Sequence, residues 1–356
     1  MVGGMNQRLI AAVAAVPLVL GLILAAALMP LPFVVYAPGY TVDVLAKDQN
    51  EAEIIQVNGH KTYRDGGELR MTTVLVTAPE TKKTLFELMS AWADPDDAVY
   101  PYDDVHGDVK TDEQNQIEGE VQMLTSQDAA IAVAQRELGL DVTPLPGVSH
   151  VNAGEPADGK LLPRDLFLNI GGRQVTTAEE VVAAIQGSKP GEPLDIVVLR
   201  DHKRKEVSVV PVRGDDGSEI GIFLGTGFRF PFDVSVKISP DIGGPSAGLM
   251  FSLAIYDTLT PGSLTDDEIV AGTGEIAPDG RVGPIGGIQQ KVVAARDSDA
   301  ELFMVPEANC EEALQADNGD MQLVLAETMH SARLAIEAWA DDRDADLPSC
   351  EDVKTS

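Results

Sequence analysis

The sequence is poor in cysteine, histidine and basic residues, and each shortage excludes a class of protein. Among 356 residues there are 2 cysteines, 5 histidines and 26 lysines and arginines, against 57 aspartates and glutamates. The formal net charge of −31 argues against nucleic-acid binding, because a phosphate backbone needs a basic surface. The chain carries no H-E-x-x-H motif for zinc and no G-x-x-x-x-G-K-[ST] loop for a nucleotide. We therefore expect neither a metal nor an organic cofactor, and an activity that does not depend on ATP.

An uncharged, apolar run near the N-terminus extends from Leu9 to Met29. Its length matches the ~20 residues that span a bilayer. Because Arg8 precedes the run and the next charge is Asp43, the positive-inside rule places the rest of the chain outside the cytoplasm. We expect residues 1–32 to anchor the protein in a cell membrane by a single span, with the bulk on the extracytoplasmic side. A cleavable signal peptide, processed near Ala25–Ala27, is the alternative.

A serine lies among small residues in Asp241-Ile-Gly-Gly-Pro-Ser246-Ala-Gly248, ahead of a helix-like run over Leu249–Leu259. A nucleophilic hydroxyl needs a tight turn, so that substrate can approach and backbone N–H groups can face the developing oxyanion. The glycines permit close backbone approach, and the N-terminal end of the following helix favours negative charge. The segment predicts Ser246 as a nucleophile, with Gly244, Pro245 and Ala247 on the oxyanion and substrate side. An ordinary turn that caps a helix is the alternative.

Downstream of Ser246, Lys291 is the only lysine before the C-terminal tail. It lies on a predicted helix that opens after Gly287, and it shares one face of that helix with Ile288 and two alanines. A free lysine titrates near pH ~10.4, so its amine must lose water to act as a base near neutral pH. An apolar helix face supplies that desolvation, although a half-buried lysine that extends to solvent fits the same pattern. Together, the serine and the lysine predict a Ser–Lys hydrolase.

Residues 230–340 resemble the proteolytic domain of Lon-type peptidases. The shared motifs are, in order, Gly244-Pro-Ser-Ala-Gly248, Thr273-Gly-Glu-Ile276, Pro284-Ile-Gly-Gly287 followed by Lys291, and Pro306-Glu-Ala-Asn309. The resemblance implies that Ser246 is the nucleophile, that Lys291 is the general base and that Thr273 orients the lysine. The chain departs from the family at Gly243, where Lon proteins usually carry aspartate.

A second resemblance lies upstream. Gly154-Glu-Pro-Ala157 and Leu161-Leu-Pro-Arg-Asp165 match the G-S-P-A…L-x-x-G-D pattern of bacterial PDZ domains, with Glu155 in place of serine and Arg164 in place of glycine. The resemblance implies capture of a peptide by strand addition, with Pro144–Val148 as the candidate carboxylate-binding loop. A module that only positions the protease is the alternative. With the N-terminal run, this order resembles the membrane-bound PDZ–Lon-like proteases of bacteria.

These observations predict an α+β protein of five segments. They are a transmembrane anchor or signal (1–32), a small β/α region (33–140), a PDZ-like domain (141–214), a Lon-type Ser–Lys proteolytic domain (215–345) and a tail (346–356). The predicted function is ATP-independent, membrane-anchored serine endopeptidase activity on exported or membrane-associated polypeptides. A predicted strand over Val234–Ile238 offers an edge, at Val234 and Val236, to an extended substrate. The family resemblance also allows a homo-oligomer.

Two other functions fit parts of the sequence. The PDZ-like and Lon-like segments could bind polypeptides as a scaffold that cuts nothing. Gly244–Gly248 also fits G-x-S-x-G, the nucleophile elbow of esterases with a Ser–His–Asp triad. That elbow follows a strand directly and needs a histidine, whereas the predicted strand ends early and the only downstream histidine is His330.

The two cysteines, Cys310 and Cys350, both fall in the C-terminal part of the chain. In an oxidising compartment an even count permits one disulfide, which would tie the tail to the region of Cys310. Two buried free thiols are the alternative, because spacing alone does not establish proximity.

Overall fold

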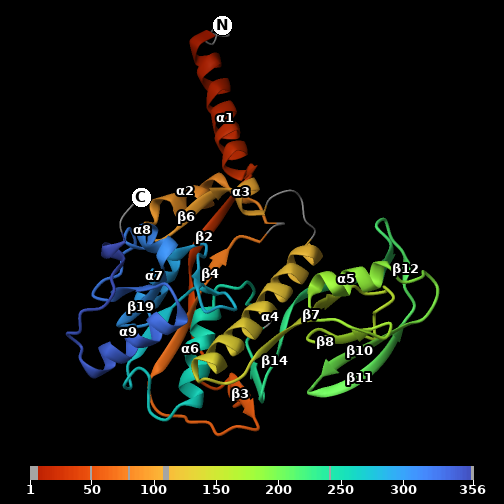
Figure 1. Cartoon of the computed structure of the whole chain (residues 1–356). Helices are drawn as coiled ribbons and strands as arrows, with labels where there is room; N and C mark the ends of the chain where they lie inside the picture. Colours follow the sequence, from red (N-terminus) through yellow and green to blue (C-terminus); the bar gives the residue numbers. More distant parts are fainter. Residues whose placement is uncertain (1–6, 49, 79–80, 107–111, 240–241, 354–356) are drawn as a thin grey trace.

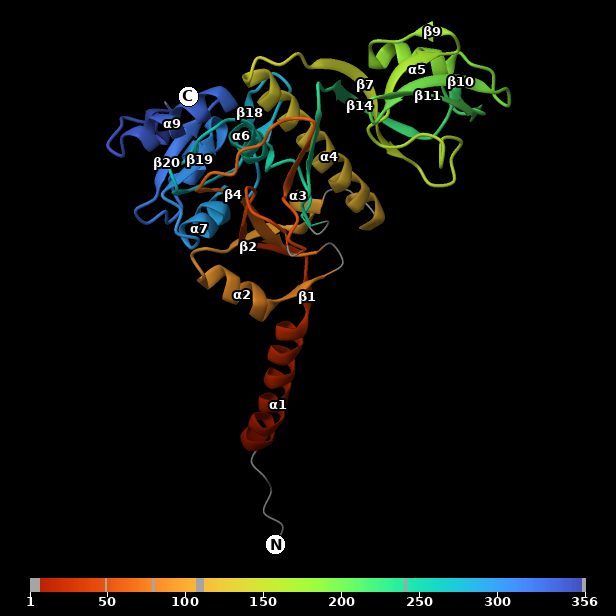
Figure 2. The same cartoon turned by 90° about the horizontal axis from the view of Figure 1, so that it is seen from below.

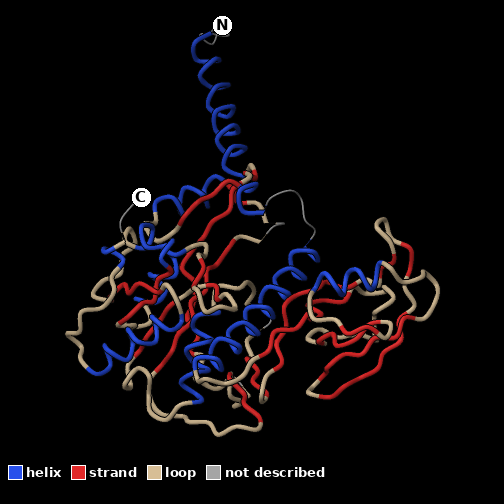
Figure 3. The backbone as a smooth tube through the Cα atoms, viewed as in Figure 1, coloured by secondary structure: helices blue, strands red, loops and turns tan. Residues whose placement is uncertain are grey.

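The computed structural model describes residues 7–48, 50–78, 81–106, 112–239 and 242–353. Figure 1 and Figure 3 show a larger body, built from the N-terminal and C-terminal parts of the chain, beside a smaller body from the middle of the chain. Figure 2 shows the same separation from a perpendicular direction.

The larger body is built on a six-stranded sheet with the order β20-β19-β16-β4-β2-β6. β4, β16, β19 and β20 run parallel to one another, whereas β2 is antiparallel to both of its neighbours. Residues 33–140 and 215–345, which the sequence predicts as separate segments, therefore share one sheet across the β4–β16 pair. The strands are β2 (Phe33–Asp43), β4 (Glu68–Val76), β6 (Ala98–Pro101), β16 (Ile269–Gly272), β19 (Leu302–Pro306) and β20 (Gln322–Ala326).

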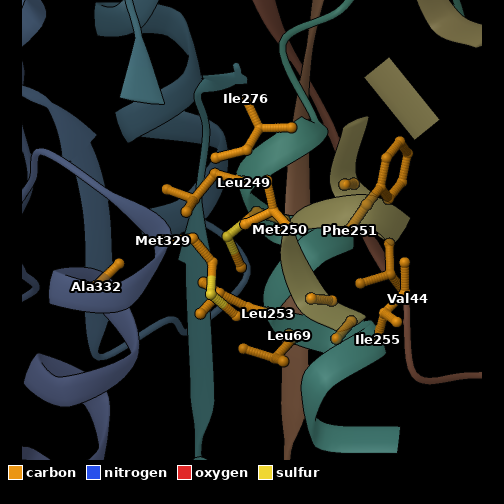
Figure 4. Packing of buried hydrophobic residues seen from close by; sticks show 14 of the residues in the cluster. Val44, Leu69, Leu249, Met250, Phe251, Leu253, Ile255, Ile276, Met329 and Ala332 are labelled. Atoms are coloured by element: carbon orange, nitrogen blue, oxygen red, sulfur yellow. The ribbon is translucent and has the colours of Figure 1, made fainter. Parts of the chain in front are cut away.

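Helices cover both faces of this sheet, because its parallel strands are apolar on both sides. Along β19, Met304 packs with α6 (Gly248–Leu259) and α9 (Met329–Asp341), whereas Phe303 and Val305 pack with α7 (Ile288–Arg296) and α8 (Cys310–Ala313). Figure 4 shows the first face, where side chains of α6 and α9 meet those of β4. The result is a mixed α/β architecture. This corrects the predicted α+β class, because helices connect parallel strands here rather than standing apart from the sheet.

The smaller body is a sheet with the order β11-β10-β8-β7-β14, accompanied by α5 (Ala178–Gln186). α5 begins at Thr177, which forms a reciprocal capping box with Glu180. Pro144–Val148, the predicted carboxylate-binding loop, lies inside β7 and pairs with β14, so it is a strand and not a loop. The strands are β7 (Thr143–Val151), β8 (Leu166–Ile170), β9 (Arg173–Gln174), β10 (Leu194–Arg200), β11 (Lys203–Val209) and β14 (Ile222–Arg229).

A long helix and several short elements complete the described chain. α4 (Asp112–Glu137) runs between the two bodies and packs on α6. The short elements are β1 (Pro30–Leu31) with β5 (Lys83–Thr84), β3 (Ile55–Asn58) with β15 (Asp233–Val236), β12 (Val212–Arg213) with β13 (Ser218–Glu219), β17 (Glu275–Ile276) with β18 (Val282–Gly283), α2 (Leu85–Ala93), α3 (Tyr102–His106) and 3₁₀ turns at Glu307–Asn309 and Cys350–Asp352.

The predicted transmembrane helix is wrong. α1 (Gln7–Leu28) projects from the larger body, as Figure 1 shows. In the part of the chain that the structure describes, no helix combines the length and the apolar character that crossing a bilayer requires. The predicted single-pass membrane location, with an extracytoplasmic catalytic domain, depended on this helix and is wrong for the same reason. Residues 1–6 lie outside the described part.

Cys310 and Cys350 form a disulfide with an Sγ–Sγ distance of 2.02 Å. Both are buried in the apolar cluster between the sheet, α7 and α8. The bridge ties the 3₁₀ turn that follows α9 to the start of α8.

Loss of this disulfide is expected to lower the free energy of unfolding by about 4 kcal/mol. The bridge joins residues 40 positions apart, and the chain-entropy relation gives roughly this value for such a loop. Urea unfolding of the double variant Cys310→Ser/Cys350→Ser, compared with the oxidised wild type, measures the difference. As a control, a thiol reductant should destabilise the wild type but leave the double variant unchanged. Equal unfolding midpoints for the oxidised wild type and the double variant would contradict the expectation.

Candidate active site

Ser246 lies in the turn that leads into α6. Its carbonyl oxygen accepts hydrogen bonds from the Gly274 N–H at 2.8 Å and from Thr273 Oγ1 at 3.0 Å, which fix the turn to the end of β16. Gly244 has φ +88°, a left-handed conformation that glycine adopts without strain. No described residue accepts a hydrogen bond from the backbone N–H of Ser246 or of Ala247. These two donors at the start of a helix are therefore free to bind an anion.

Lys291 comes from α7, on the other face of the sheet. The helix starts at Gly287, whose φ of +68° again favours glycine, and a Cβ there would lie 3.0 Å from the side chain of Val74. The lysine side chain crosses to the serine turn, and its residue is 2% exposed. Nζ lies 2.7 Å from Ser246 Oγ and 2.9 Å from Thr273 Oγ1. The structure thus brings together the three residues that the sequence predicts as catalytic.

Burial lowers the pKa of the Lys291 amine from 10.5 to about 7. Burial is the one cause of this lowered pKa, and no carboxylate among the described residues offsets it by favouring the charged amine. A substantial part of the lysine is therefore neutral near pH 7, as a base requires.

The hydrogen bonds of Thr273 set the orientation of the amine. Its one hydroxyl hydrogen is donated to the Ser246 carbonyl, so its oxygen accepts from the Lys291 Nζ. A neutral amine that gives one hydrogen to Thr273 retains a lone pair for the Ser246 hydroxyl. The arrangement can remove a proton from Ser246 without a histidine or a metal ligand.

Ser246 and Lys291 open into a cavity of about 390 Å³. One side is formed by residues 71–76 of β4 and the other by the serine turn, which contributes Ile242, Gly243 and, from the predicted oxyanion side, Gly244 and Ala247. The remaining lining residues are Tyr36, Tyr40, Met123 and Gly286. Pro245 lies in the same turn but does not line the cavity.

Val234 and Val236, the predicted substrate-strand residues, lie elsewhere. They belong to β15, which pairs with β3, and they are 7% and 5% exposed in the main core. The strand beside Ser246 is β4. Its first residues, up to Met71, pair with β16, while Thr72–Val76 have no strand of the described residues on that edge. Sequence alternation identifies β4 as a strand, but no local signal places it next to a serine so far along the chain.

The esterase alternative lacks its histidine. His330, at the start of α9, is paired with Glu137 of α4: its Nδ1 lies 2.6 Å from Glu137 Oε1. The described contacts of Ser246 Oγ include Lys291 but no histidine. Asp241, the acidic residue nearest to the position where Lon proteins usually carry aspartate, lies outside the described residues.

Comparison with known proteins assigns two regions of the chain. Residues 239–332 match the Lon protease (S16) C-terminal proteolytic domain, and residues 124–210 match a PDZ domain. Lon protease 1 of Herpetosiphon aurantiacus is 44% identical over 115 residues, which cover 32% of this chain and 13% of that protein. Lon protease homolog 2, peroxisomal, of Caenorhabditis elegans is 40% identical over 89 residues, which cover 24% and 11%. The PDZ domain of the SdrC-like protein from Listeria innocua is 28% identical, covers 22% of this chain and 90% of that domain, and has a TM-score of 0.21.

The matches confirm the prediction of a serine peptidase domain of the Lon type and of a PDZ domain before it. The chain spans only a small part of its Lon relatives, between 11% and 13% of the two proteins named above.

Proposed function

We propose that the protein is an endopeptidase in which Lys291 activates Ser246 to cleave polypeptides. The observation that carries this proposal is the 2.7 Å contact between a buried amine and the serine hydroxyl. The match to the Lon proteolytic domain supports it, because the matched region contains both residues.

In the proposed reaction the neutral Lys291 amine takes the hydroxyl proton as Ser246 Oγ attacks the peptide carbonyl carbon. The carbonyl oxygen becomes an oxyanion held by the N–H groups of Ser246 and Ala247. The protonated amine then delivers its proton to the leaving nitrogen as the C–N bond breaks. Water attacks the acyl-enzyme with Lys291 again as base, releasing the carboxylate product and restoring the serine. Thr273 holds the Lys291 nitrogen in place throughout, so that its lone pair, whenever the amine is neutral, is directed at the attacking oxygen.

The substrate is proposed to extend along β4. The edge of Thr72–Val76 faces the cavity, and the backbone of an extended peptide can pair with it as an added strand. Leu75 and Val76, which are 56% and 41% exposed, provide apolar contacts for alternate substrate side chains. A folded substrate cannot present such a strand, so we propose unstructured or locally unfolded polypeptides as substrates, and cleavage without ATP.

The PDZ domain offers a second site for polypeptides. β14 pairs with β7 on one edge only, no described strand covers its other edge, and α5 packs nearby. We propose that this edge binds a peptide segment of the substrate by strand addition.

Labelling with a fluorophosphonate probe tests the proposed nucleophile. Purified protein should be labelled at Ser246, as located by peptide mass spectrometry, with a rate that rises with pH through about 7. The sign follows from the lowered pKa of Lys291, because the amine is protonated below about pH 7 and cannot accept the proton. At pH 6 we expect a rate roughly 10-fold below the plateau. The variant Ser208→Ala, at an exposed serine, should label like the wild type. Absence of labelling would favour a binding scaffold, whereas labelling of Ser246 that is insensitive to pH between 5 and 9 would refute Lys291 as the base.

A further inference from the structure

α4 connects the PDZ domain with the serine turn. Figure 1 and Figure 2 show it running between the two bodies, and it packs on α6, which begins directly after the turn. Where α4 lies between the serine turn and the PDZ domain, three consecutive polar residues are buried: Ser126, Gln127 and Asp128, with exposed fractions of 4%, 9% and 9%. Buried polar side chains need partners, and here the partners belong to two different domains.

Ser126 holds the peptide that contains the nucleophile. Its hydroxyl donates to the Pro245 carbonyl oxygen at 2.9 Å. Gly248 permits this approach, since a Cβ there would lie 2.8 Å from Ser126 Oγ. In a trans peptide the carbonyl and the N–H point in opposite directions, and the described chain contains no cis peptide. Fixing the Pro245 carbonyl on the α4 side therefore directs the Ser246 N–H away from α4, and this N–H is one of the proposed oxyanion donors.

Arg164 holds the same helix from the PDZ side. Its guanidinium lies 2.9 Å from Asp128 Oδ1 and 3.3 Å from Gln127 Oε1. The residue has φ +71°, a left-handed backbone conformation that favours glycine. Arg164 thus occupies a position whose backbone conformation is unfavourable for an arginine. Its side chain contacts the turn of α4 that contains Ser126.

We propose that Ser126 is a positioning residue of the active site, and that Arg164 of the PDZ domain holds the helix that carries it. The inference rests on the proposed function, because the positioned group is the nucleophile. It assigns to the PDZ domain an influence on the rate of the chemical step, separate from any role in binding substrate.

The first test compares single variants on a short peptide that reaches only the cavity. Ser126→Ala should lower kcat about 10-fold with KM within 2-fold, because an oxyanion donor loses its fixed direction. The pH at which the rate is half-maximal should not move, since Lys291 is untouched. Ser126→Thr, which restores a hydroxyl, should recover most of kcat. Thr125→Ala is the matched control, because within the described part of the chain that hydroxyl bonds to the Val121 carbonyl of its own helix and not to the serine turn.

The second test joins the two contacts. Arg164→Gly, which suits the backbone conformation, should lower kcat about 3-fold in the wild type and have no further effect in Ser126→Ala. Arg173→Ala, at an exposed arginine of the same domain, should leave kcat unchanged.

Independent, multiplicative effects of Arg164→Gly and Ser126→Ala on kcat would overturn the connection through α4. A Ser126→Ala variant with unchanged kcat and a lowered melting temperature would show a structural role only. Failure of the wild type itself to cleave or to label would instead contradict the proposed function, and the inference with it.

Discussion

Replacing Ser246 with alanine is expected to lower kcat/KM for peptide cleavage by at least ~10⁴, the scale on which serine peptidases depend on their nucleophile. No other described hydroxyl stands in the same relation to the turn. Thr273 also contacts the Lys291 amine, but it donates its hydrogen to the Ser246 carbonyl. The reaction would therefore lose its attacking atom while retaining the free N–H groups that bind the oxyanion.

The fold should survive this change. The turn is held by the backbone carbonyl oxygens of Pro245 and Ser246, which alanine retains at position 246. Circular dichroism and the urea midpoint of Ser246→Ala should therefore match the wild type to within about 1 kcal/mol, and Ser208→Ala serves as the activity control. Cleavage within 10-fold of the wild-type rate by a folded Ser246→Ala variant would refute the assignment.

Replacing Lys291 with methionine is expected to lower kcat/KM by about 10³ or more and to stabilise the protein at the same time. Methionine retains the length of the side chain but has no basic nitrogen. Lys291→Arg should be equally inactive, because a guanidinium stays protonated.

The gain in stability follows from the cost of burying the amine. The unfolded chain binds the lysine proton up to about pH 10.5, whereas the folded chain releases it at about pH 7. Below pH 7 this difference destabilises the fold by roughly 5 kcal/mol, and the penalty fades as the pH rises from 7 to 10.5. We expect Lys291→Met to raise the free energy of unfolding at pH 7 by about 3 kcal/mol, after the loss of two hydrogen bonds.

Urea unfolding at pH 7 and at pH 10 checks this expectation. The stability of the wild type should rise between the two values, and the difference from Lys291→Met should shrink. Lys189→Met is the matched control, because that lysine has a side chain that is 77% exposed and should show neither effect. A destabilised Lys291→Met variant at pH 7 would mean that the amine is charged and well solvated in the folded protein.

Several features could be predicted from the sequence because they depend on neighbouring residues. The glycine-rich turn before α6, the capping box of α5 and the apolar face around Lys291 all express local rules of backbone conformation and periodicity. The motif order also sufficed to pair Ser246 with Lys291. The apolar N-terminal run shows the limit of such rules, since hydropathy alone predicted a span that the described helix does not provide.

Contacts between distant segments were decided by the tertiary structure. The sequence predicted Val234 and Val236 as the substrate edge, yet β15 pairs with β3 and the edge near Ser246 belongs to β4. Ser126 belongs to no recognisable sequence motif. Its proposed role depends on α4 packing against the serine turn, where Pro245 lies 119 residues further along the chain. Residue types and short spacings determined which groups can do chemistry here: a serine in a turn and a lysine on an apolar helix. Only the assembled sheet, which places α7 on one face and α6 on the other, removed water from that amine and brought it within reach of the hydroxyl, because desolvation is a property of packing and not of sequence neighbours.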